Sequence, residues 1–191
     1  SGEATGFRMN VDGRKGSSFN NVGILANDSM YVFVEVTVDP NGGNQPLLIQ
    51  DSVLFTVNGI RQSVLLEAYG QDVNLYKGGV TITKDSILTA NRPYLIYDSL
   101  VIAKGVSLNI EKGATFYMHD KASLIVHGSM NALGTLDEPI TFRGDRLDYI
   151  LNDILPYDRT PGQWGGITFK ADSYGNVWDN VIVRNGTSGV Y

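Results

Sequence analysis

The fold is decided by residues 100–128, which read LVIAKGVSLNIEKGATFYMHDKASLIVHG. An apolar residue, any residue, a second apolar residue, two more residues and a glycine recur there at intervals of eight, although Lys121 replaces the third glycine and Gly128 comes one position early. Each unit has the length of a short β-strand with its turn, and three units would make one coil of a parallel β-helix. Leu100 should therefore stack on Leu124, one coil later, with both side chains directed inward.

The repeat continues less regularly along the rest of the chain. Its later apolar pairs are Met130 with Ala132, Ile140 with Phe142, Ile167 with Phe169, and Val181 with Val183. About twenty residues between Phe142 and Trp164 interrupt the pattern, which predicts a loop projecting from the coils. The sequence stops in mid-pattern at Tyr191, so we expect the natural chain to continue, or its open end to be covered by another molecule or by self-association.

The first part of the chain has a different, shorter pattern of strands and turns. Residues 28–39 alternate as one long strand would, and further strands are predicted near 46–49, 52–57 and 62–69. Asn58-Gly59 is typical of the turn of a β-hairpin between the last two. Closely spaced short strands of this kind favour an antiparallel sandwich of immunoglobulin-like type.

We therefore predict an all-β chain with two domains. Residues 1–80 would form the immunoglobulin-like β-sandwich, and residues 81–191 would form the first coils of a right-handed parallel β-helix, incomplete at its C-terminus.

Composition excludes several classes of partner. The net charge is −5 and the charged residues are scattered, so the chain lacks the basic stripe that nucleic acid requires. It has no cysteine, which excludes a disulfide framework and cysteine-ligated zinc, and it has no run of eighteen apolar residues that would predict a transmembrane span. No nucleotide-binding fingerprint or P-loop occurs, and we expect no cofactor.

Residues 124–142 and 163–169 carry the further motifs V-x-G-x-x-x-A-x-G-T, P-I-x-F and W-G-G-I-x-F. In this respect the chain resembles exported right-handed parallel β-helix proteins of Gram-negative gut bacteria, and residues 66–72 resemble their N-terminal sandwich domain. The resemblance implies an exported protein at the cell surface or in the periplasm. It also implies a lipid anchor of the outer-membrane type, attached through a cysteine just before residue 1.

The same bacterial group attaches sugars to Ser or Thr that follows Asp and precedes a small or aliphatic residue. The resemblance therefore makes O-glycosylation candidates of Ser29, Ser52, Ser86 and Ser99. Ordinary turn chemistry is the alternative, because each of these Asp-Ser pairs precedes a predicted strand.

The interruption at residues 143–163 is the best candidate for a ligand-binding site. Carboxylates can bind calcium or hydrolyse glycosides, and aromatic rings can stack on sugars. The candidate residues are Asp145, Asp148, Tyr149, Asp153, Tyr157, Asp158 and Trp164. A solvated loop whose aromatic residues pack on the coil is the alternative, and Arg143-Gly144-Asp145 is interpreted as a turn rather than an integrin-type tripeptide.

No metal site or catalytic set is predicted. His119 and His127 are eight residues apart, so they should leave adjacent faces of the coil in different directions. We expect a non-enzymatic cell-envelope protein that binds a polysaccharide or another surface partner, such as a surface protein. The alternatives are a polysaccharide lyase or glycoside hydrolase, with its catalytic residues in coils beyond this chain, and a structural adhesin.

Overall fold

The computed structural model describes residues 6–38, 47–147 and 157–191, and almost every regular element in these ranges is a β-strand. Backbone contacts divide the chain into an N-terminal unit, residues 1–72, and a coil unit, residues 73–191. The division falls before the predicted boundary at residue 81, because β6 (Asn74–Tyr76) already pairs with the coil strand β9 (Tyr94–Ile96).

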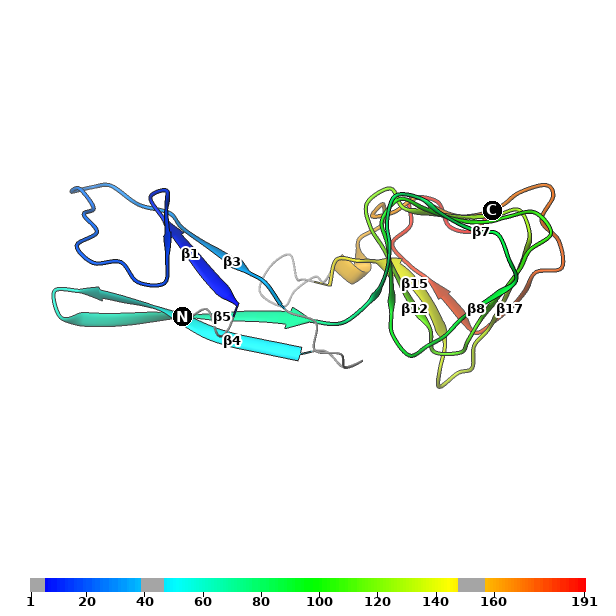
Figure 1. Cartoon of the computed structure of the whole chain (residues 1–191), viewed down its shortest axis with the longest axis horizontal. Helices are drawn as coiled ribbons and strands as arrows, with labels where there is room; N and C mark the ends of the chain where they lie inside the picture. The colour runs from blue at the N-terminus through cyan, green and yellow to red at the C-terminus, as the bar shows by residue number, and fades with distance from the viewer. Residues whose placement is uncertain (1–5, 39–46, 148–156) are drawn as a thin grey trace. The chain divides into compact units, whose positions relative to one another are not determined.

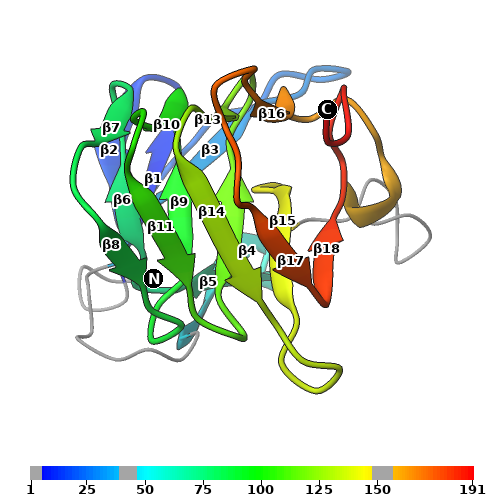
Figure 2. The ribbon, with the colours of Figure 1, turned by 90° about the vertical axis from the view of Figure 1, so that its right-hand side faces the viewer.

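The coil unit consists of three parallel sheets, to each of which successive coils add a strand (Figures 1 and 2). One sheet has the order β16 (Gly166–Phe169), β13 (Ser123–Val126), β10 (Ser99–Ile102), β7 (Val80–Ile82). The second has the order β17 (Val177–Asp179), β14 (Ser129–Leu133), β11 (Ser107–Ile110), β8 (Ser86–Leu88). The third has the order β18 (Val181–Val183), β15 (Ile140–Gly144), β12 (Thr115–Met118), then β9 and β6. This stacking of parallel sheets is consistent with a β-helix.

The pairing register confirms the predicted repeat. Leu100 lies opposite Leu124, as the interval of eight residues requires. Ser107 pairs with Ser129 and Thr115 pairs with Thr141, so the other faces repeat at slightly different intervals because their corners differ in length.

Inward positions of the three sheets form one hydrophobic core. Both apolar residues of each repeat unit from Leu100 to Phe142 are buried, and Ile102, Leu108 and Val126 have no exposed surface at all. Burying one such side chain contributes about 1.5–3 kcal/mol, so stacking coils is the main source of stability. On the third sheet, the rings of Tyr94, Phe116 and Phe142 form a continuous stack with centroids 4.9 and 4.5 Å apart.

The corners explain the recurring glycine. Gly105 and Gly113 have φ values of 75° and 80°, in the left-handed region that a residue with a Cβ adopts only at a cost. Lys121, which occupies the same position in the next repeat unit, has φ of 63° and accepts that conformation. The corner geometry is therefore repeated even where the glycine is not.

The N-terminal unit is antiparallel throughout the described residues. Its three-stranded sheet has the order β2 (Arg14–Gly16), β1 (Phe7–Val11), β3 (Val32–Val36), and β4 (Leu47–Val57) pairs with β5 (Ile60–Gly70) in a long hairpin. The hairpin turn at Asn58-Gly59 is confirmed, since both residues have positive φ, at 50° and 79°.

Two predictions for the N-terminal unit need correction. The strand expected over residues 28–39 is shorter, and the strands expected near 46–49 and 52–57 form a single strand, β4, because Asp51 and Ser52 continue the ladder to β5. The immunoglobulin-like sandwich is not confirmed. Only Phe7, Met9, Val11 and Val53 are buried among the apolar residues described in this unit. In the ranges that the structure describes, no helix is long and apolar enough to cross a membrane.

Candidate functional site

The predicted site residues that the structure describes lie around one corner of the coil unit, between β15 and β16. Asp148, Tyr149 and Asp153 fall outside the described residues. Tyr157 and Asp158 belong to a short 3-10 helix, η2 (Tyr157–Arg159), which lies near β15.

Asp158 anchors this segment to the coils. Its carboxylate lies 3.2 Å from the guanidinium of Arg143 on β15 and 2.8 Å from that of Arg184, directly after β18. Since β15 and β18 are neighbouring strands, one aspartate ties two successive coils to η2. Removing it would leave the partly buried Arg143 side chain without this carboxylate, so Asp158 has a structural task in the fold.

Amide side chains reinforce the same anchor. Gln163 Nε2 donates to the carbonyl oxygens of Tyr157 and Thr160, and Asn185 Nδ2 donates to the carbonyl oxygens of Tyr157, Asp158 and Thr160. The guanidinium of Arg146 lies 3.5 Å from the centre of the Tyr157 ring. Tyr157 is therefore also engaged by the protein itself.

The predicted role of Trp164 as a ligand-stacking residue is wrong. Its side chain is 1% exposed and packs in the coil core, and its indole Nε1 donates to the carbonyl oxygen of Arg184 at 2.7 Å. Its backbone already pairs with Gly186 of the next coil, so the ring is directed into the stack and not into the loop. The turn expected at Arg143-Gly144-Asp145 is also corrected, because Arg143 and Gly144 are the last residues of β15.

Asp145 leads to a group of residues that sequence reasoning did not assemble. Its Oδ2 lies 2.6 Å from Nδ1 of His119, and the two side chains are 21% and 42% exposed. An ionised carboxylate can only accept, so Nδ1 of His119 donates this hydrogen bond, and the other ring nitrogen, Nε2, takes no part in it. The ring of Tyr97 lies 4.2 Å from that of His119, and Lys77 Nζ lies 5.4 Å from the centre of the Tyr97 ring.

These four residues, Lys77, Tyr97, His119 and Asp145, form what we call the corner ladder. They directly follow β6, β9, β12 and β15, whose last residues pair in register from one coil to the next. Their backbones are fixed as well. The amides of Tyr97, His119 and Asp145 each donate to a carbonyl of the preceding coil, at 2.9, 2.8 and 3.1 Å.

A second column of side chains lies beside the corner ladder on the outer face of the third sheet. Leu75, Leu95, Tyr117 and Arg143 occupy paired positions two residues before the ladder residues, on the same face of each strand. The corner ladder is thus the polar border of a surface that carries two tyrosine rings, Tyr97 and Tyr117.

The second histidine forms a similar pair on another corner. His127 follows β13 and its Nδ1 lies 2.9 Å from Oδ1 of Asp172. Burial raises the pKa of Asp172, but the hydrogen bond from His127, a backbone hydrogen bond and the charges of His127 and Lys104 outweigh burial and hold the pKa below its usual value. The two histidines follow strands of different sheets, as predicted, and within the described ranges no group of three acidic or imidazole side chains is placed to hold a metal ion.

The four candidate glycosylation serines occupy different environments. Ser29 is exposed, whereas Ser52 is half-buried within β4. Ser86 opens β8 and its hydroxyl donates to the carbonyl of Lys84 at 2.7 Å, and Ser99 is the half-buried first residue of β10. Of the four, Ser29 presents its side chain most openly.

No family model and no solved structure matches the chain. Over 104 residues, which make up 52% of this chain, it is 31% identical to Protein bark beetle of Drosophila melanogaster. The chain spans 3% of the length of that relative. The fold and the site thus define the class, an all-β repeat protein with stacked parallel sheets and an ordered polar and aromatic surface at one corner.

Proposed function

We propose that this chain is a non-enzymatic cell-envelope protein whose coil unit binds a glycan along the corner ladder. The observation that carries the proposal is that four successive coils each place a charged or aromatic side chain at the same position, and that neighbouring side chains are in contact. Adjacent strands lie about 4.8 Å apart, so the ladder repeats on the scale of one sugar ring.

The chemistry of the ladder fits the two kinds of surface that a sugar presents. Ring faces rich in C–H groups stack on aromatic side chains, for which Tyr97 and the neighbouring Tyr117 are placed. Hydroxyl groups both donate and accept hydrogen bonds, so they can be bound by the ammonium group of Lys77 and by Nε2 of His119. Because paired strands hold the backbone of these residues in register, little loop entropy is lost on binding.

The cellular location and the finer fold class belong to the same proposal. The motifs at residues 124–142 and 163–169 support an exported, lipid-anchored surface protein with a right-handed parallel β-helix. The parallel register of the three sheets agrees with that class, and right-handed crossovers are the general rule for parallel strands. The antiparallel pairing of the N-terminal unit supports the assignment of an immunoglobulin-like domain.

The test is retention in affinity gels that contain plant, host or microbial polysaccharides. Loss of the Tyr97 ring in Tyr97→Ala should weaken retention about tenfold, equivalent to roughly 1.4 kcal/mol of stacking energy. Tyr174→Ala is the matched control, because Tyr174 is 79% exposed on the same unit and lies outside the corner ladder. Equal retention of the two variants, or no retention by any polysaccharide, would overturn the proposal.

A polysaccharide-cleaving enzyme is the second candidate. It is favoured by the His119–Asp145 pair, since a carboxylate on Nδ1 orients an imidazole whose Nε2 can accept a proton. Release of reducing or unsaturated sugar ends in the same incubations, abolished in His119→Gln, would replace the binding function by catalysis. A structural adhesin would show neither retention nor products.

A further inference from the structure

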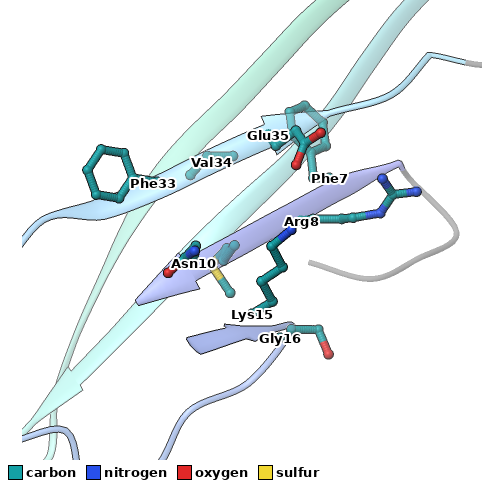
Figure 3. A pocket seen from close by; sticks show the side chains of 10 residues that line it. Phe7, Arg8, Asn10, Lys15, Gly16, Phe33, Val34 and Glu35 are labelled. Atoms are coloured by element: carbon teal, nitrogen blue, oxygen red, sulfur yellow. The ribbon is translucent and has the colours of Figure 1, made fainter. Parts of the chain in front are cut away.

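The N-terminal unit contains a cavity of about 580 Å³ on its three-stranded sheet, lined by both charged and apolar side chains (Figure 3). Residues from β1, β2 and β3 line it. Among them, Arg8, Asn10, Lys15, Phe33 and Glu35 occupy mutually paired positions and therefore share one face of the sheet. Sites for small ligands commonly have volumes of about 300–1,000 Å³, so the cavity is large enough for one.

The charged groups around this cavity are not neutralised by one another. Arg8 and Glu35 lie directly opposite on β1 and β3, yet no ion pair joins them, and Lys15 has none either among the described residues. Arg8 makes a long hydrogen bond of 3.4 Å to the Thr37 hydroxyl. Figure 3 shows Lys15 extending from β2 toward β1, with Glu35 on the opposite side of β1.

Each part of the cavity makes a different chemical demand on a ligand. Arg8 and Lys15 call for an anion, preferably a carboxylate or another oxyanion. Glu35 can only accept hydrogen bonds, so it needs a hydroxyl or amine donor beside that anion. Phe33 is 65% exposed and offers an apolar ring face, with Tyr31 at a centroid distance of 6.3 Å.

We propose that this cavity is a binding site for a small acidic saccharide. A sugar that carries a carboxylate meets the three demands together, because its carboxylate faces Arg8 and Lys15, its hydroxyls face Glu35 and Asn10, and its C–H face packs on Phe33. An inorganic anion would satisfy only the two cations, and a metal cation would be repelled by them. The site lies on a different unit from the corner ladder, so it does not depend on the proposed function of the coils.

The probes are methyl glucuronide and methyl glucoside, which differ in one carboxylate. We would titrate each into the isotope-labelled full chain and follow backbone amide signals by two-dimensional NMR. Glucuronide should shift the signals of β1, β2 and β3 with a millimolar dissociation constant, and glucoside should bind about tenfold more weakly, as expected for loss of charge-assisted hydrogen bonds.

Variants identify which side chains are responsible. Arg8→Gln and Lys15→Gln should each remove most of the preference for glucuronide, whereas Arg61→Gln, which changes an exposed arginine on β5, should leave it unchanged. All three positions are exposed, and unchanged signals elsewhere in the spectrum will show that the fold is retained. Equal shifts with both sugars, shifts confined to the coil unit, or no shifts at all would overturn the assignment.

Discussion

The coil unit and the N-terminal unit distribute their apolar side chains differently. In the coil unit, the inward residues of three sheets form one core. In the N-terminal unit few apolar residues are buried, while β3 and the β4–β5 hairpin expose a series of large ones. These include Phe33, Val34, Val36, Leu48, Leu54, Val57, Ile60, Val64 and Leu65.

The difference follows from how each unit defines its interior. A coil buries its apolar face against the coil before it, so the repeat that forms the strands also forms the core. An antiparallel hairpin pairs its backbone by itself and still needs a second layer to cover its apolar face. Strand pairing and burial of apolar side chains therefore occur together in the coil unit. In the N-terminal unit, strand pairing alone does not bury the apolar side chains.

The largest expected effect comes from the centre of the aromatic stack. Phe116→Ala removes a ring that is 1% exposed and packed between Tyr94 and Phe142, so we expect it to lower the free energy of unfolding of the coil unit by about 3–5 kcal/mol. Phe33→Ala, at a ring that is 65% exposed, should change stability by less than about 0.5 kcal/mol.

Native-state hydrogen exchange read by mass spectrometry resolves the two units and measures both variants. If Phe33→Ala destabilises its unit as much as Phe116→Ala destabilises the coils, the proposed difference in core formation between the two units is wrong.

Substitutions at two glycines, one in each unit, should have effects of intermediate size on stability. A Cβ at Gly128 would lie 2.0 Å from the Val106 carbonyl oxygen, so Gly128→Ala should cost about 3 kcal/mol through a clash between coils. Gly13 has φ of 78° and open space around it, so Gly13→Ala should cost only about 1 kcal/mol, from backbone strain.

Asparagine separates the two causes. It tolerates positive φ, so Gly13→Asn should recover most of the lost stability in chemical denaturation, while Gly128→Asn should remain as unstable as the alanine variant. Recovery of stability at both positions would mean that contacts between coils do not restrict the choice of residue at position 128.

The smallest expected effect concerns pH. The pKa of Asp172 is lower in the folded chain than in the unfolded chain, so its stabilising contribution is present above about pH 4 and is lost as the pH falls through the folded value. Between about pH 5 and pH 3, the thermal midpoint of the coil unit should fall more in the wild-type protein than in Asp172→Asn. Parallel curves for the two proteins would show that the His127–Asp172 pair does not contribute to the acid response.

The sequence predicted the fold best in the coils, where equivalent residues recur at a regular interval. The pairing of Leu100 with Leu124 followed from counting, because equivalent residues of stacked coils must share a face. The hairpin at Asn58-Gly59 was also predictable, since two consecutive residues with positive φ restrict the choice of amino acid. The remaining N-terminal strands were harder to predict, because nothing local in residues 46–57 distinguishes two short strands from the single strand β4.

The site was predicted less well because its residues follow the register of the coils and not a local motif. Trp164 was predicted to belong to an exposed loop site. Its backbone bridge to Gly186 makes it part of the coil stack, and its side chain is buried. Lys77 and Tyr97 were missed, since the regular repeat was recognised only from Leu100 onward. The coils are shorter there, since Phe116 pairs with Tyr94 and Tyr94 with Asn74, so the repeat read from Leu100 onward could not have located them.

The position of the two tryptophans has a practical consequence for spectroscopy. The chain contains two, Trp164 and Trp178, and both belong to the coil unit, one in its core and the other packed against Phe142 and Phe169. Light that excites indole but not phenol will therefore produce emission from the coil unit alone. The intact chain carries a built-in fluorophore for its coils, and unfolding of that unit can be followed optically without cutting the chain or attaching a dye.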